Sequence, residues 1–308
     1  MSICPIEKLI QFDLLDDCIL TPAGYYHFYR YYPPNTDIMT EEEKKAEIEQ
    51  MTQLFDTLAR EIAIFATDKI EDMSEIKRFY KNLAPEYDHL TSDIIAAIES
   101  TESRNSAAVQ RAFYFIIRTD KQEESVYNQI AGKGYHINKA QREELAVLLR
   151  NYYLREFISA EIYTLEKELK QDVKLRKKIE KKPELFQKEL QRRLLPHSME
   201  FFPSFAVQNG TYRSTMMLKN FPFEIGSCCL LQTACMRGTS FMMRLTPMNG
   251  REIKKLTEKQ MNKSSYKRSS TQATDQLEGL SEQTALAEFY QAVSNSQTTL
   301  FFVSVYIE

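Results

Sequence analysis

The last hundred residues of this 308-residue chain contain three apolar strand patterns separated by polar helical ones. Residues 210–222 (GTYRSTMMLKNFP) and 236–247 (MRGTSFMMRLTP) each have the pattern of a strand that is closed by proline. Residues 249–252 (NGRE) open a long polar helix, and the apolar run 298–308 (TTLFFVSVYIE) predicts a further strand. A flat apolar strand with an open edge invites aggregation, so we expect the last strand to pair within a sheet.

The N-terminal part predicts two strands, a helix and another strand, in that order. Residues 18–32 have the pattern of a hairpin, with Gly24 available for the positive φ that a turn requires. Thr40, followed three residues later by Glu43, has the spacing of a helix capping box. The apolar segment 61–67 then predicts the next strand.

The middle of the chain has mainly helical patterns. A strong strand is predicted over 112–119 (AFYFIIRT). Asn138 is placed to cap a very long helix that continues into a basic stretch and stops by Pro183. A short helix is predicted over 184–194, before Pro196.

The second half has an order of elements similar to that of the first. The predicted elements are strands 201–207 and 212–219 with an Asn209-Gly210 turn between them, helix 223–234, strand 240–245, helix 250–263, a polar gap over 264–274, helix 281–294 and strand 300–307. Split β-α-β units of this kind pack helices on one face of an antiparallel sheet. We therefore predict an α+β fold of two ferredoxin-like units joined by a long helical connector. The expected domains are 1–137, 138–196 (the connector) and 197–308.

Composition argues against several kinds of chemical site. The chain has only 8 glycines and contains no GxxxxGK[ST] pattern, so no phosphate-binding loop is predicted. Its 4 histidines are scattered and its 5 cysteines include no CxxC pair, so no metal site and no cofactor are predicted. Cys228 and Cys229 lie in an apolar run and are expected to be buried and reduced. We expect no catalytic activity from this chain alone.

Neither a signal peptide nor a membrane-spanning segment is predicted. The N-terminus contains acidic residues and lacks the basic start and continuous apolar core of a signal peptide. No stretch approaches the roughly 18 uninterrupted apolar residues that span a bilayer. We expect a cytoplasmic protein that is at most peripheral to the inner face of the cell membrane.

Charge is distributed unevenly, although the net charge is only −3. Residues 170–193 contain 10 basic and 4 acidic side chains, a net charge of +6, and residues 251–268 contain 7 basic and 2 acidic ones, a net charge of +5. Such stretches are either docking surfaces for an acidic partner or anionic lipid, or solvated helix faces. The candidate interaction residues in the first stretch are Lys174, Arg176, Lys177, Lys178, Lys181 and Lys182.

Residues 25–32 (YYHFYRYY) have an unusually aromatic strand pattern. Aromatic side chains on a ferredoxin-like sheet can stack nucleobases, as in RNA-recognition modules. Those modules have basic, glycine-containing aromatic strands, whereas Arg30 is the only Lys or Arg in this segment. The favoured interpretation is an edge strand that packs on a helix.

One family has the succession of motifs found over residues 201–308. Tyr212-Arg213-x-Thr215 precedes an apolar run and a proline, a second strand ends in proline before a long Lys-, Glu- and Gln-rich helix, and a Leu-Phe-x-Val-x-Val-Tyr strand follows. This succession resembles the N-terminal portion of the large ATPases of type IV secretion and conjugative DNA transfer, the CagE/TrbE/VirB-type family. Residues 24–34 and 109–118 lie where that family has strands. The resemblance implies an ATP-binding motor after this region, so we expect the chain to be truncated before that motor.

Two functions follow as hypotheses. The resemblance implies a non-catalytic assembly module that docks the motor on the inner-membrane complex and on neighbouring subunits, with other type IV secretion components as partners and with self-association. The alternative is a stand-alone nucleic-acid-binding protein with ferredoxin-like domains. Salt-dependent binding of DNA or RNA would separate the two.

Overall fold

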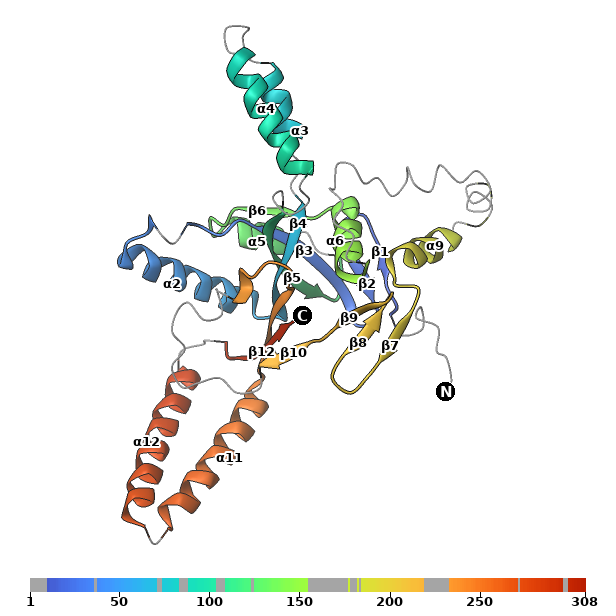
Figure 1. The fold of residues 1–308 in the computed structure, drawn as a ribbon. Coiled ribbons are helices and arrows are strands. Elements are labelled where there is room, and N and C mark those ends of the chain that lie inside the picture. The colour runs from blue at the N-terminus through green and yellow to red at the C-terminus, as the bar shows by residue number, and fades with distance from the viewer. Residues whose placement is uncertain are drawn as a thin grey trace. The chain divides into compact units, whose positions relative to one another are not determined.

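The structure of the chain is a computed structural model, and Figure 1 draws its helices and strands as a ribbon. The chain divides into two compact units. It describes residues 10–35, 38–70, 74–82, 88–103, 109–122, 125–154, 177, 182, 184–218, 233–270, 272–295 and 299–308. The first unit consists of Met1–Pro34, Ala63–Met243 and Ser304–Glu308, and the second consists of Asn35–Ile62 and Arg244–Val303. The domain ranges expected from the sequence, 1–137, 138–196 and 197–308, stay a prediction.

The first unit is built on a nine-stranded sheet with the order β1-β2-β3-β5-β4-β11-β12-β10, in which β6 also pairs with β3. The strands are β1 (Asp13–Leu14), β2 (Ile19–Thr21), β3 (Gly24–Tyr31), β4 (Ile62–Ile70), β5 (Val109–Thr119), β6 (Ile137–Lys139), β10 (Met216–Leu218), β11 (Phe241–Pro247) and β12 (Phe301–Ile307). β11 leaves this unit after Met243, and β12 enters it at Ser304. The pairs β1–β2, β2–β3, β3–β5, β3–β6 and β10–β12 are antiparallel.

A second, three-stranded antiparallel sheet also belongs to the first unit. Its order is β7-β8-β9, with β7 at Met199–Phe201, β8 at Ala206–Gln208 and β9 at Thr211–Arg213. The helices described for the unit are α3 (Ser74–Lys81), α4 (Asp88–Ser103), α5 (Ser125–Ala131), α6 (Arg142–Leu154) and α9 (Glu184–Leu194). The α+β class predicted from the sequence is therefore confirmed.

The main core of the first unit lies between the large sheet and the helices α6 and α9. Leu145 and Leu148 of α6 and Leu190 and Leu194 of α9 are buried there with apolar side chains of the sheet. These helices pack on each other and on β1. Burying each large aliphatic side chain contributes about 1.5–3 kcal/mol, so this cluster holds the helices to the sheet.

The large sheet has helices on both faces, which differs from the one-sided arrangement expected from the sequence. Tyr114, Phe115, Ile116 and Ile117 are consecutive in β5 and are all buried, so both faces of this strand need cover. Tyr26 and Phe28 pack on the cluster with α6 and α9. Tyr29, on the alternate face of β3, instead lies with its ring centroid 6.2 Å from that of Tyr127 in α5. The two separate ferredoxin-like sheets are not confirmed, because strands from both halves of the chain share one sheet.

The aromatic strand Tyr25–Tyr32 was expected at a sheet edge, and this is wrong. β3 lies between β2 and β5, and His27 and Tyr29 are completely buried. The hairpin with β2 is confirmed, and its Gly24 has a φ of +133°. A Cβ at this position would lie 2.8 Å from the Thr119 carbonyl oxygen, so the glycine permits the close approach of β5.

The second unit contains α2 (Glu41–Leu58), α11 (Gly250–Arg268) and α12 (Ala273–Asn295), together with one end each of β11 and β12. Asp56 of α2 accepts a hydrogen bond from the Thr299 backbone N–H at 2.9 Å. The Met248 N–H donates to the Leu300 carbonyl at 2.8 Å. These bonds join α2, the end of β11 and the start of β12 within this unit.

Several element boundaries differ from those predicted. Asn138 lies in strand β6 rather than at a helix cap, and the helix that follows begins at Arg142. The polar segment 264–274, expected as a gap, belongs to α11 as far as Arg268 and to α12 from Ala273. Most of the predicted long connector beyond Leu154 lies outside the described residues, as does most of the predicted helix 223–234.

Candidate interaction surfaces

The three-stranded sheet of the first unit is held by one face and exposes the other. Its register aligns Val207 with Tyr212 and Ala206 with Arg213. Neighbouring residues of a strand point to opposite faces, so these two pairs lie on different sides of the sheet. Gln208 and Arg213 lie on the held face and are buried.

Hydrogen bonds to α6 fix the held face. The Gln208 amide donates to the Tyr153 carbonyl, and the Arg213 guanidinium donates to the Tyr152 carbonyl. Burial is the main cause that raises the pKa of the Tyr152 hydroxyl above its ordinary value, and the nearby carboxylate of Glu308 is the second cause. The Tyr152 hydroxyl therefore stays protonated beside the arginine.

The turn between β8 and β9 aligns these strands. Asn209 and Gly210 have φ values of 48° and 78°, the left-handed conformations that a two-residue hairpin turn requires. The Asn209 side-chain oxygen accepts hydrogen bonds from the backbone N–H groups of His197 (2.9 Å) and Ser198 (3.2 Å). The turn predicted from Asn209-Gly210 is confirmed, and its asparagine also ties the segment that follows α9 to the sheet.

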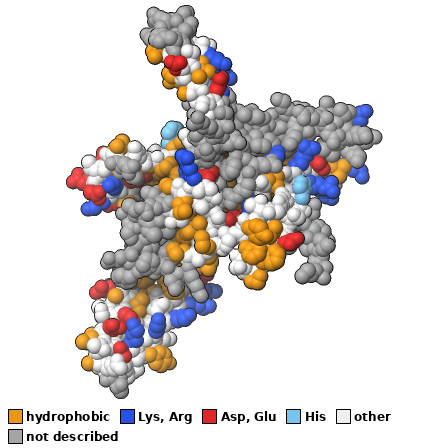
Figure 2. Space-filling view, in the orientation of Figure 1, with side chains coloured by type: hydrophobic (Ala, Val, Ile, Leu, Met, Phe, Trp, Pro, Cys, Tyr) orange, Lys and Arg blue, Asp and Glu red, His pale blue; other side chains and the backbone are white. Residues whose placement is uncertain are grey.

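Three aromatic side chains form what we call the aromatic face: Phe202, Phe205 and Tyr212. The rings of Phe202 and Phe205 stack with centroids 4.6 Å apart, and those of Phe205 and Tyr212 are 5.5 Å apart. Tyr212 is 74% exposed and Phe202 is 45% exposed. Figure 2 shows hydrophobic side chains gathered where Figure 1 places β7, β8 and β9. Clustered, ordered and exposed aromatic rings are typical of binding surfaces.

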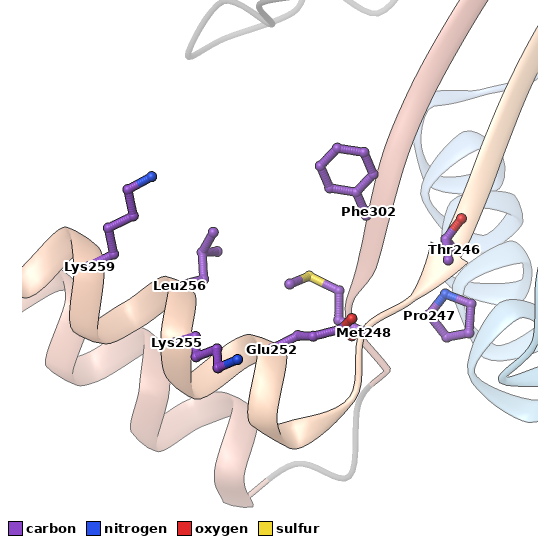
Figure 3. A pocket seen from close by; sticks show the side chains of 8 residues that line it. All are labelled: Thr246, Pro247, Met248, Glu252, Lys255, Leu256, Lys259 and Phe302. Carbon is purple, nitrogen blue, oxygen red and sulfur yellow. The ribbon is translucent and has the colours of Figure 1, made fainter.

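A pocket in the second unit lies between the start of α11 and the strand β12 (Figure 3). It has a volume of about 470 Å³ and a predominantly apolar lining. Met248, Leu256 and Phe302 project into the same open space, and Phe302 is 63% exposed. Its other lining residues are Thr246, Pro247, Glu252, Lys255 and Lys259. The pocket suits an apolar side chain with an acidic neighbour, because lysines stand beside its apolar surface.

Helix α11 begins where the sequence predicts it. Asn249 is its N-cap: the Asn249 side chain accepts from the Glu252 N–H at 3.0 Å, and the Asn249 N–H donates to the Glu252 carboxylate at 2.9 Å. This capping box fixes the first turn, which carries the pocket residue Glu252. Basic side chains gather along the helix in Figure 2.

The candidate interaction residues of the basic stretch are only partly described. Lys177 and Lys182 are exposed, and Lys177 lies in helical backbone. Lys174, Arg176, Lys178 and Lys181 lie outside the described residues, as do Cys228 and Cys229. The docking role of this stretch therefore stays a prediction.

The buried polar groups of the first unit form structural pairs. The Tyr114 hydroxyl donates to the Glu144 carboxylate at 3.0 Å, and Lys69 lies 3.1 Å from the same carboxylate. Burial, and then the charge of Glu144, raise the pKa of Tyr114 well above its ordinary value. These contacts join β4 and β5 to α6.

Arg111 and Asp68 hold a loop in place. Their side chains lie 2.9 Å apart and are 9% and 6% exposed. Arg111 also donates to the carbonyls of Ala234 (2.6 Å) and Thr239 (2.5 Å), and Asp68 accepts from the Gly238 N–H at 2.5 Å. The pair thus satisfies the backbone of the segment that leads into β11.

Within the part of the chain that the structure describes, no group of three or more His, Cys, Asp or Glu side chains could hold a metal ion. None of the helices described is both long and apolar enough to cross a membrane.

The fold defines this chain as an α+β protein with a nine-stranded sheet and a smaller three-stranded sheet in its first unit. No protein-family model matches the chain, and no curated protein matches it. The resemblance to type IV secretion ATPases therefore rests on the motif pattern in the sequence.

Proposed function

We propose that this chain is a protein-docking module of a type IV secretion or conjugative transfer machine, equivalent to the non-catalytic N-terminal portion of its ATPase. The aromatic face carries the proposal. The rings of Phe202 and Tyr212 are exposed and both contact the partly buried ring of Phe205, on a sheet whose opposite face is held by buried hydrogen bonds. A rigid aromatic surface binds a partner at a small cost in side-chain entropy.

The proposed partners are components of the inner-membrane complex of such a machine, with the module at the inner face of the cell membrane. Two observations support a docking role rather than catalysis. The sequence has no phosphate-binding loop, and the buried ionisable groups described above join structural elements. The motif resemblance supports the choice of machine.

Nucleic-acid binding is the second candidate function. It is favoured by α11, whose 7 basic and 2 acidic side chains give the helix a net charge of +5. Exposed aromatic rings can also stack nucleobases. Glu200 lies on the same side of the sheet as Val207 and Tyr212, however, and this carboxylate would oppose a phosphate backbone.

Co-purification of the tagged full chain from its source cells tests the docking function. We expect recovery of inner-membrane components of a type IV secretion system. A Phe202→Ser/Tyr212→Ser variant should recover them about tenfold less well, because aromatic anchors dominate interface energies. The matched control is Phe79→Ser on α3, which removes another exposed phenylalanine and should leave recovery unchanged.

A titration with DNA and RNA at several salt concentrations tests the second candidate. A docking module should bind neither at physiological salt. Nucleic-acid binding whose logarithm falls linearly with the logarithm of salt concentration, together with no secretion component recovered, would contradict the docking function in favour of the second candidate.

A further inference from the structure

We propose that the α11–α12 hairpin is a self-assembly surface, in which the outer, basic side of α11 and its adjoining pocket bind the apolar, acidic helix α12 of a second copy of this chain. This inference goes beyond the proposed function and uses different residues from the aromatic face. Figure 1 shows α11 and α12 side by side as a helical hairpin. All residues concerned belong to the second unit.

The hairpin is held together by small and polar side chains. A Cβ at Gly279 would lie 2.8 Å from the Ser264 carbonyl oxygen, so the helices approach closely at this point. Ser264 donates to the Glu282 carboxylate at 2.8 Å, and Lys267 lies 2.5 Å from that carboxylate. The buried residues of α11 are Thr257 and Ser264. The large apolar side chains described for the two helices thus contribute little to the contact between α11 and α12.

Those apolar side chains face solvent instead. Six of them are between 41% and 80% exposed: Leu256, Tyr266, Leu277, Leu280, Phe289 and Tyr290. Isolated exposed apolar residues are ordinary on protein surfaces, but this number on one helical pair is typical of an interaction surface.

The charges of the two helices are of opposite sign. α11 has a net charge of +5, whereas α12 has 4 acidic side chains and neither Lys nor Arg. Lys255, Lys259 and Lys263 are exposed and recur every four residues, so they form one stripe along α11. Each copy therefore has a basic helix, α11, and an acidic helix, α12. The charge of α11 complements that of α12 in the same copy and in a second copy alike.

The apolar groups match in the same way. Leu277 and Leu280 of α12 are 70% and 48% exposed and are three residues apart, so they lie on one side of the helix. Glu278, between them in the sequence, is also exposed, and its carboxylate lies 3.6 Å from Lys267 of the same chain. The pocket formed by Met248, Leu256 and Phe302, beside Lys255 and Lys259, presents the complementary arrangement of apolar surface and positive charge.

A second copy offers opposite charge to both the basic helix α11 and the acidic helix α12. An anionic lipid surface would attract only α11. The 4 carboxylates of α12 would be repelled by anionic headgroups. The surfaces on α11 and α12 differ, so the contact is heterologous and can continue beyond a dimer.

Sedimentation velocity on the purified full chain over a range of concentrations tests this inference. The wild type should associate reversibly, and less strongly in high salt. Two variants should each weaken association by about tenfold or more: Lys255→Glu/Lys259→Glu/Lys263→Glu, which reverses the stripe on α11, and Leu277→Ser/Leu280→Ser, which removes the leucines of α12. The matched control Lys81→Glu/Lys121→Glu/Lys188→Glu makes the same change in net charge at exposed lysines elsewhere and should associate like the wild type.

A mixture of the two variants gives the sharpest outcome. Each variant retains the surface that the other has lost, so a mixture in equal amounts should form a one-to-one complex that grows no further. A wild type that is monomeric at every concentration, variants that associate like the wild type, or variants that do not combine would each overturn the inference. Circular dichroism spectra that match the wild type's show that the variants are folded. Binding of secretion components through the aromatic face is a separate measurement and can succeed or fail independently.

Discussion

The guanidinium of Arg213 lies 3.1 Å from the carboxylate of Glu308, and the two side chains are only 6% and 11% exposed. The same guanidinium donates to the Tyr152 carbonyl and lies 5.6 Å from the centre of the Tyr152 ring. One arginine thus joins the three-stranded sheet, helix α6 and the residue after β12. The aromatic face is presented by a sheet that this arginine holds in place.

We predict that Arg213→Met destabilises the protein by about 3 kcal/mol or more, because it leaves the Glu308 carboxylate buried without its partner. Urea unfolding monitored by circular dichroism measures the change in the free energy of unfolding. The control is Arg192→Met on α9, whose side chain is 71% exposed and whose ion pair with Glu189 is a surface one. That change should stay within about 0.5 kcal/mol. Equal effects of the two substitutions would contradict the structural role of Arg213.

Gly279→Ala should destabilise the α11–α12 hairpin, although alanine is normally favoured over glycine in a helix by about 1 kcal/mol. The added methyl group would meet the Arg268 backbone nitrogen at 2.7 Å and force the helices apart. Hydrogen exchange over residues 250–295 should become faster. Gly250→Ala is the matched control, since the added carbon would meet nothing within 4 Å beyond its chain neighbours and its own helix backbone, and it should leave exchange unchanged or slow it. Slower exchange in both variants would show that the helices are not in close contact.

Cys18 should react slowly with thiol reagents. Burial, and then the negative charge of Asp17, raise the pKa of its thiol to about 12. At pH 8 we therefore expect iodoacetamide to modify the exposed Cys235 well before Cys18 in the native protein. Mass spectrometry of peptides from a time course would detect the order, and equally rapid labelling of both cysteines would contradict it.

The same raised pKa predicts how stability depends on pH. The contribution of the neutral thiol is complete below the unfolded-state pKa of about 8.5 and is lost as the pH rises from there toward 12. The stability difference between the wild type and Cys18→Ala should therefore shrink over this range. A difference that is constant from pH 8 to pH 11 (about the span between the two values) would be inconsistent with a thiol that stays protonated in the folded state.

The purified chain should neither bind nor hydrolyse ATP, because its sequence contains no GxxxxGK[ST] pattern. Calorimetric titration with Mg-ATP and a phosphate-release assay measure these properties. Stoichiometric activity that survives repurification would show that the nucleotide is bound by residues of another kind.

Local features of the fold could be predicted because their signals lie within a few residues. Thr40 and Glu43 form the predicted capping box, with the Glu43 N–H donating to Thr40 Oγ1 at 3.2 Å and the Thr40 N–H donating to the carboxylate at 2.7 Å. The turn at Gly24 is equally local. In such cases side-chain chemistry and backbone conformation are determined together.

Pairing between distant segments could not be predicted in the same way. Residues 212–219 read as one strand, but Arg213 pairs with β8 and Met216 pairs with Ile307 of β12 in the other sheet. The partner of a strand in a sheet is decided by contacts between residues far apart in the sequence. The periodicity of a single strand does not contain that information.

The aromatic face was missed for a related reason. Phe202 and Phe205 come together only through the pairing of Phe201 with Ala206, and the strands involved have three residues each. Alternation over three residues is too short to predict which side chains face solvent. The predicted turn at Asn209-Gly210 correctly places Tyr212 beside β8, but a turn does not tell which face of the sheet is exposed.

Site-specific photo-cross-linking in the source cells tests the docking function most directly. A photoreactive phenylalanine analogue at position 212 should cross-link to an inner-membrane component of a type IV secretion system. The same analogue at position 79, also exposed but on α3, should not. Cross-links from position 212 to nucleic acid alone, or identical protein cross-links from both positions, would contradict a docking role for the aromatic face.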